Sequence, residues 1–180
     1  MYAILDENDK ILSFTSFNGS GGVDVKELGE FAKVGMTLWG CWKVKLKKEL
    51  WALLPEKVKG AKKNIIGKPD MSDEELEVQL QLYREKYEDA KNGLDVFEGQ
   101  ALEKGVSQEE YRAFVIAKGD EFVLSDKLIA DRIELVRGMM EDRINKIDSL
   151  ERLGSVIGKF EAVGGFDMET PVGEIVNSLE

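Results

Sequence analysis

The spacing of the apolar residues changes near residue 72, and this change constrains the fold more than any other feature of the sequence. Residues 36–47 alternate between two sets of positions, one largely apolar and one carrying three lysines, which is the two-residue repeat of a β-strand. After residue 72 the apolar residues recur at steps of three and four, which places them on one face of an α-helix. The sequence therefore predicts an α+β protein, with a small N-terminal antiparallel sheet followed by a C-terminal helical bundle.

Strands are predicted for the first part of the chain, which we expect to form a β-rich N-terminal module over residues 1–55. Residues 2–5 and 11–14 are short apolar runs, and the turn-forming residues Asp6–Lys10 between them indicate a β-hairpin. Residues 36–47 are predicted to add the clearest strand, with one face on the core and the lysines of the other face in water.

Two segments rich in glycine or proline are predicted to be irregular. Residues 56–70 carry Gly60, Gly67 and Pro69 among lysines, and we interpret them as a basic linker between two regions. Residues 17–22 contain three glycines, which predicts a flexible loop.

The charge of the chain is divided unevenly along its length. Residues 1–70 hold 12 Lys against 9 Asp or Glu, a net charge of +3, whereas residues 71–180 hold 13 basic and 26 acidic residues, a net charge of −13. Residues 43–68 alone hold nine lysines against two glutamates. This asymmetry predicts two regions with different surfaces, of which only the basic one would attract a polyanion.

Residues 71–180 are predicted to be an α-helical region. Ser72–Glu75 and Ser107–Glu110 have the spacing of capping boxes, in which a serine hydroxyl and a glutamate carboxylate satisfy free amides at a helix start. The dipeptide Lys118–Gly119 indicates a helix end, and the longest helix is expected over residues 121–147.

Apolar stripes on these helices are the candidate packing or interaction surfaces. The first stripe consists of Leu76, Leu80, Tyr83, Tyr87 and Ala90. A shorter stripe is expected to bury Tyr111, Phe114 and Val115. The candidate interaction seam on the longest helix consists of Ile129, Ile133, Val136, Met140 and Ile144. These stripes either pack within the chain or form an oligomeric coiled coil, and any part left exposed would mark a partner surface.

The composition excludes most catalytic and metal-binding chemistry. The chain has no histidine and one cysteine, Cys41, which excludes histidine acid–base catalysis, serine or cysteine triads and multi-cysteine metal sites. The paired carboxylates lie at expected helix starts, where they complement the helix dipole. We therefore expect no catalytic, cofactor or metal site, and a protein that is not an enzyme.

Tryptophans interleaved with lysines form the most unusual segment of the sequence. The candidate nucleic-acid or partner patch consists of Trp39, Lys43, Lys45, Lys47 and Trp51. Aromatic faces next to cations are what proteins use to bind single-stranded nucleic acid. Residues 1–83 contain no arginine, the residue best suited to phosphate and base contacts, so a solvated lysine face is the competing interpretation.

Three segments resemble proteins associated with phage and prophage tails. Met1–Leu12 is similar to the strand-turn-strand openings of these proteins, and Ala101–Tyr111 and Ile147–Leu153 are similar to their helical C-terminal regions. The resemblance implies an accessory or assembly role in a tail or baseplate, without catalysis, and assigns no functional residue.

The leading functional prediction is a non-enzymatic interaction or assembly protein, derived from a phage or prophage, that binds a protein partner or itself. The alternatives are a nucleic-acid-associated protein that uses residues 39–68, and an acidic inhibitor that uses residues 71–180 to occupy a basic site on a host protein. No apolar run approaches the roughly 20 residues that span a bilayer, and the first seven residues lack the basic and apolar parts of a secretory signal. We therefore expect no membrane partner and a location in the cytoplasm of a host bacterium or in the virion.

Overall fold

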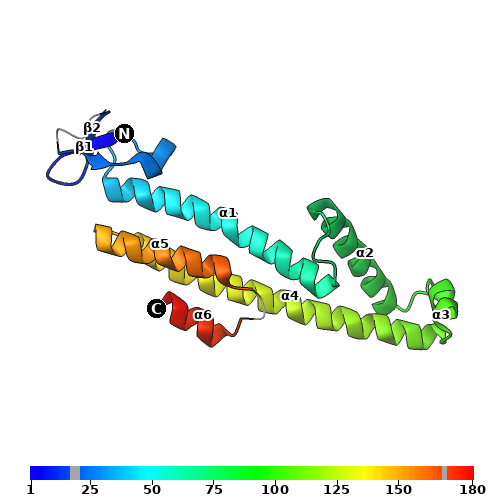
Figure 1. Cartoon of the computed structure of the whole chain (residues 1–180). Helices are drawn as coiled ribbons and strands as arrows, with labels where there is room; N and C mark the ends of the chain where they lie inside the picture. Colours follow the sequence, from blue (N-terminus) through cyan, green and yellow to red (C-terminus); the bar gives the residue numbers. More distant parts are fainter. Residues whose placement is uncertain (17–20, 168–169) are drawn as a thin grey trace. The chain divides into compact units, whose positions relative to one another are not determined.

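A small antiparallel sheet is followed by helices in the computed structural model, which describes residues 1–16, 21–167 and 170–180 (Figure 1). The sheet comprises β1 (Tyr2–Leu5), β2 (Ile11–Thr15) and β3 (Val23–Asp24), and the 3-10 helix η2 (Lys26–Phe31) follows it. The α-helices are α1 (Leu38–Ile66), α2 (Asp73–Lys91), α3 (Glu98–Lys104), α4 (Gln108–Asn145), α5 (Leu150–Gly165) and α6 (Val172–Leu179). This arrangement confirms the predicted α+β class with a helical C-terminal region.

The sheet has the strand order β2-β1-β3, and both strand pairs are antiparallel. The predicted hairpin is confirmed, because β1 pairs with β2 across the turn that begins at Asp6. The carboxylate of Asp6 accepts hydrogen bonds from the backbone N–H groups of Asn8 and Lys10, each at 2.9 Å, which closes the turn. Residues 17–20 of the predicted glycine-rich loop lie outside the described residues.

The predicted strand over residues 36–47 is wrong, because α1 begins at Leu38. Buried apolar residues follow one another at steps of four: Leu38, Trp42, Leu46, Leu50 and Leu54. Four residues are two strand repeats and also close to one helical turn, so the first three positions fit both structures. The helix is favoured because the step of four continues to Leu54. It also leaves Val44 on the solvent side, 49% exposed, where a strand would have buried it.

The predicted basic linker, residues 56–70, is also wrong in its first part, because α1 continues to Ile66. Pro55 lies inside this helix at an exposed position. Since proline has no N–H, the helix lacks the hydrogen bond from residue 55 to the carbonyl of Trp51. The helix ends instead before Gly67, whose φ of 75° is the left-handed conformation that glycine adopts without strain.

The chain forms two compact units. The first unit consists of Met1–Pro55 and Glu134–Glu180, and the middle unit consists of Glu56–Ile133. Both α1 and α4 contribute residues to the two units.

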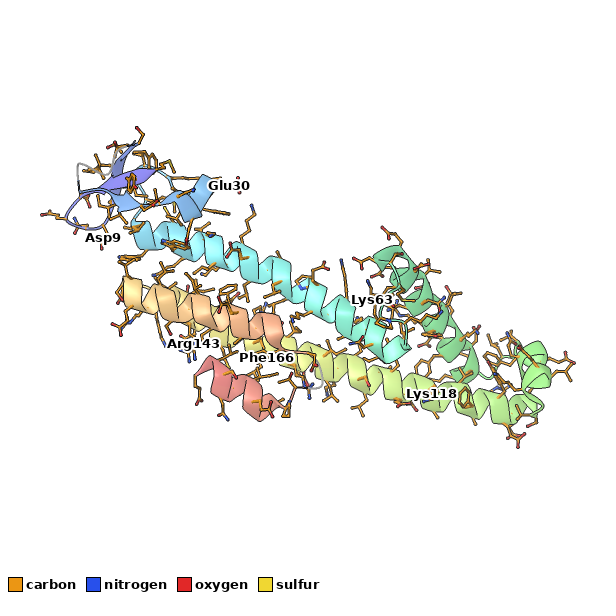
Figure 2. All side chains as sticks on the ribbon, viewed as in Figure 1. Asp9, Glu30, Lys63, Lys118, Arg143 and Phe166 are labelled. Atoms are coloured by element: carbon orange, nitrogen blue, oxygen red, sulfur yellow. The ribbon has the colours of Figure 1, made fainter. Side chains whose placement is uncertain are left out.

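The core of the first unit draws on the sheet, the start of α1 and the C-terminal helices. Its fully buried side chains include Ile11, Leu28, Cys41, Leu50, Met140, Ile144, Ile147, Ile175 and Leu179. Asp9, in the hairpin turn, lies at the start of α1 (Figure 2). Its carbonyl accepts the N–H of Leu38 at 2.8 Å, and its carboxylate accepts the indole N–H of Trp39 at 2.9 Å. The hairpin turn is thereby joined to the first turn of α1.

The helices of the middle unit begin where the capping boxes predict. The hydroxyl of Ser72 accepts the N–H of Glu75 at 3.1 Å at the start of α2, and that of Ser107 accepts the N–H of Glu110 at 3.2 Å at the start of α4. The predicted helix end at Gly119 is wrong, because α4 continues through this residue. Two helices predicted for this part of the chain are therefore one.

Candidate functional site

An open groove of about 540 Å³ lies within the middle unit, lined by α2, α4 and the end of α1. Its apolar lining from α1 and α2 consists of Ile65, Ile66, Leu80, Tyr83 and Tyr87. Its apolar lining from α4 consists of Tyr111, Phe114, Val115, Phe122 and Val123. Since five of these ten side chains are aromatic, we call this surface the aromatic groove.

The α2 wall of the aromatic groove is the middle of the stripe that the sequence predicts for this helix. Leu76 and Ala90, at the two ends of the stripe, are almost completely buried. Between them Tyr83 is 42% exposed and Tyr87 is half-buried. The stripe is therefore covered at its ends and left open in its middle.

The α4 wall is open in the same way. Phe114, predicted to be buried, is 57% exposed, and Val123 is 54% exposed. Leu124 and Leu128 continue the exposed apolar surface of α4 beyond the residues that line the groove. Several large apolar side chains of this helix are therefore exposed to water, two of them in the groove lining, and exposed apolar side chains gathered at one place are typical of a surface that meets another molecule.

A close contact between Tyr87 and Gly119 holds the two walls together. A Cβ atom on Gly119 would lie 2.0 Å from the Cδ2 atom of Tyr87, so the ring occupies the space that any other residue would fill. The hydroxyl of Tyr87 donates to the carboxylate of Asp120, and the ammonium of Lys91 lies 4.3 Å from the centre of the same ring. The tyrosine beside it raises the pKa of Lys91, so this cation keeps its charge on the ring.

Charged residues surround the aromatic groove, and cations are in excess. Lys62 pairs with Asp126 at 2.8 Å, and Lys118, labelled in Figure 2, pairs with Glu121 at 2.7 Å. The other two cations of the lining, Arg84 and Lys86, form no ion pair with any carboxylate in the described part of the chain. The groove therefore has an apolar floor, and an unpaired cation lies on each side of its α2 wall, because residues two apart on a helix project in nearly opposite directions.

The candidate patch of tryptophans and lysines is partly assembled by α1. Trp39, Lys43, Lys47 and Trp51 follow at steps of four and lie along one side of the helix, whereas Lys45 lies elsewhere on its circumference. Trp39 is engaged with Asp9, and Trp51 is 56% exposed with the guanidinium of Arg137 5.5 Å from its ring. Four of the five predicted residues thus share a stripe, although its two indoles already have partners.

Most lysines of the basic segment are paired with carboxylates. At least five of the nine lysines in residues 43–68 form ion pairs: Lys45–Glu49 at 3.5 Å, Lys48–Glu30 at 3.0 Å, Lys59–Asp73 at 2.6 Å, Lys62–Asp126 at 2.8 Å and Lys63–Asp73 at 2.8 Å. The ammonium groups of Lys59 and Lys63 lower the pKa of Asp73 to about 2. The positive field predicted from composition is therefore much reduced in the folded chain.

The predicted interaction seam on α4 is buried rather than exposed. Ile129, Val136, Met140 and Ile144 are at most 5% exposed, and Ile133 is half-buried. The seam is thus part of the packing within the chain, which is one of the two alternatives that its spacing leaves open. On the same helix, the exposed apolar residues lie closer to the N-terminus: Phe114, Val123, Leu124 and Leu128.

Cys41 is buried and unpaired, in α1 rather than in a sheet. Within residues 1–16, 21–167 and 170–180, no cluster of three or more carboxylate or cysteine side chains is placed to hold a metal ion. In the same part of the chain, no helix is both long and apolar enough to cross a membrane.

No protein-family model, curated protein or solved structure matches the chain.

The sequence places the groove residues on the correct helical stripes but assigns them to the core. The signal that could have separated them is the use of tyrosine. Three of the four tyrosines of the chain, Tyr83, Tyr87 and Tyr111, line the aromatic groove. Tyrosine combines an apolar ring with a hydroxyl that needs water or a partner, so it suits half-exposed positions better than leucine or isoleucine does.

Proposed function

We propose that this chain is a non-enzymatic protein-interaction or assembly protein, and that the aromatic groove of the middle unit is its binding surface. The observation that carries the proposal is the open middle of two facing apolar stripes, with Tyr83 and Phe114 exposed on opposite walls. Burial of exposed aromatic side chains supplies much of the binding energy in protein interfaces.

The chemistry of the groove supports binding rather than catalysis. The chain has no histidine to act as a general base at neutral pH. The two carboxylates of the lining, Glu121 and Asp126, are each held in an ion pair with a lysine. Neither carboxylate is placed as the desolvated acid of a hydrolytic pair.

The resemblance to phage and prophage tail proteins adds a context to this proposal. A tail-accessory or assembly role would give the groove a structural partner. The location in a host cytoplasm or in a virion remains a prediction from that resemblance.

A photo-crosslinking residue at the groove tests the proposal. The chain carrying p-benzoylphenylalanine in place of Phe114 is irradiated in a lysate of the cells that produce it, and protein adducts are identified by mass spectrometry. The matched control carries the same residue in place of Leu150, which is 68% exposed on α5 of the first unit. We expect an adduct with a defined protein, or with a second copy of the chain, from position 114 and not from position 150.

The opposite results would contradict the proposal. These are equal adducts from both positions, or no adduct from position 114 in a chain that turns over a substrate. Light scattering during size-exclusion chromatography separates a self-associating chain from one that binds another protein.

A nucleic-acid function is the second candidate, favoured by the alignment of Trp39, Lys43, Lys47 and Trp51 along α1. The two candidates use different surfaces, because this stripe belongs to the first unit and the aromatic groove belongs to the middle unit. Substitutions in one surface therefore leave the other intact. The acidic-inhibitor alternative would respond to charge reversal of carboxylates in residues 71–180 and to neither of these changes.

A further inference from the structure

The uncompensated cations at the groove identify the chemistry of its partner. Resting on the proposed function, we infer that the aromatic groove takes one amphipathic α-helix of a partner protein, which inserts an apolar face between α2 and α4 and presents carboxylates to Arg84 and Lys86.

The length of the groove along α4 fits a helix of about two turns. Tyr111 and Phe122 line the groove from the same face of α4 and lie eleven residues apart, which at about 1.5 Å per residue is about 17 Å. Apolar residues at positions i, i+4 and i+7 of a bound helix span about 10 Å, and this spacing is how helices that bind in grooves present their anchors. The walls of the groove therefore offer room for three anchor side chains.

The charge at the groove selects carboxylates on the flanks of that helix. Four cations line the groove against two carboxylates, and those two are already paired with Lys62 and Lys118. The excess is local, because the middle unit as a whole holds 13 basic and 18 acidic residues. Two unpaired cations beside the groove of an otherwise acidic unit attract an acidic partner there, whereas the rest of the unit repels it, and this difference favours the groove as the site.

The other occupants fit these observations less well. A single strand of nucleic acid would find only Arg84 and Lys86 uncompensated beside the aromatic rings. A second copy of the chain would bring a net charge of −10 against a net charge of −10, which opposes association.

A display library of designed helices tests the inference on the full chain. Each helix carries leucine or phenylalanine at i, i+4 and i+7, and its flanking positions vary among Asp/Glu, Lys/Arg and Ser/Gln. We expect the chain to enrich acidic flanks, with at least tenfold tighter binding than for the same helix with basic flanks. The double variant R84E/K86E should reverse this preference.

The matched control is the double variant K104E/K127E, which makes the same change of charge at two exposed lysines of the middle unit outside the groove lining. We expect it to keep the preference for acidic flanks. A preference for acidic flanks that is unchanged in R84E/K86E would overturn the inference.

Further outcomes separate the inference from the proposed function. Helices enriched without regard to flank charge, and lost in the variant F114D, would overturn the inference and leave the proposed function standing. If the unaltered chain binds no helix more tightly than the F114D variant binds it, both the inference and the proposed function are contradicted. If the chain forms a dimer that the F114D substitution dissociates, the partner is a second copy of the chain and not the inferred helix. If a single-stranded oligonucleotide displaces the bound helix, the partner is nucleic acid.

Discussion

The ring of Tyr87 lies against the α-carbon of Gly119, where a Cβ atom would be 2.0 Å from the Cδ2 atom of the ring. The two residues belong to α2 and α4, and the contact sets how closely these walls of the aromatic groove approach. The glycine is thus inside a continuous helix because a neighbour needs the space, and not because the helix ends there.

Replacing Gly119 with alanine should therefore destabilise the chain, although alanine is the better helix former. Forcing a methyl group into a filled space costs about 1–3 kcal/mol. We expect the free energy of unfolding in urea to fall by that amount in Gly119→Ala.

Gly138 on the same helix provides the control, because a Cβ atom there meets no atom within 4 Å. Gly138→Ala should stabilise the chain by roughly 0.5–1 kcal/mol. Equal stabilisation by both substitutions would show that the contact between Tyr87 and Gly119 is absent in solution.

Replacing Pro55 with alanine should stabilise α1. The substitution supplies an N–H for the carbonyl of Trp51 and removes the clash of the proline ring inside the helix, an effect of up to about 3 kcal/mol. Pro55 is exposed, so little packing is lost. Thermal unfolding followed by circular dichroism measures the effect, and an unchanged or lower midpoint would contradict the expectation.

Asp73 should titrate well below an ordinary aspartate. Its pKa falls from 3.8 to about 2 because Lys59 and Lys63 donate hydrogen bonds to the carboxylate. Since the pKa in the folded chain is below the unfolded value, these ion pairs stabilise the fold above pH 3.8, and their contribution is lost as the pH falls to about 2.

Carboxyl resonances in NMR spectra report the pKa of Asp73 directly. The double variant K59Q/K63Q should move it up toward 3.8, and K104Q, which removes one positive charge from the end of α3, should leave it in place. No change in K59Q/K63Q would mean that the two ion pairs do not form in solution.

Loss of either capping serine should destabilise its helix. Ser72→Ala and Ser107→Ala each remove a hydroxyl that accepts a helix N–H, which costs about 1 kcal/mol. Ser155→Ala, at an exposed position inside α5, is the control and should be neutral or slightly stabilising. The midpoints of urea unfolding are compared among the three variants. Equal midpoints for Ser72→Ala, Ser107→Ala and Ser155→Ala would show that neither serine stabilises its helix start.

The stripe on α1 should bind single-stranded DNA weakly. Lys43 and Lys47 are the lysines of this stripe, and neither forms an ion pair with another described residue. If each contacts one phosphate, the logarithm of the association constant falls with the logarithm of the salt concentration with a slope of about −1.4. Fluorescence anisotropy of a labelled oligonucleotide measures this slope. A slope of about −3 or steeper that collapses in K43Q/K47Q would make nucleic acid the leading function.

Local signals in the sequence predict the hairpin and the capped helix starts correctly, because neighbouring residues alone determine them. Asp6 makes its bonds within four residues, and Ser72 and Ser107 make theirs within three. Such short-range chemistry is visible in a single sequence.

The errors arise where one spacing fits two structures, or where a distant residue decides the structure. A spacing of four suits both a strand and a helix, so Leu38, Trp42 and Leu46 do not distinguish them. Gly119 resembles a helix end until Tyr87 is found beside it. The opening at Tyr83 and Phe114 depends on how the helices of the middle unit pack around these positions, which the pattern of either stripe alone does not contain.

The complete burial of Cys41 makes its thiol a probe of local unfolding in the first unit. A thiol that is shielded from water reacts with a disulfide reagent only while the surrounding structure is open. The rate of labelling therefore reports how often that part of the structure opens. Because it is the sole cysteine, every labelled molecule reports on the same spot in the first unit, and no engineered probe is needed.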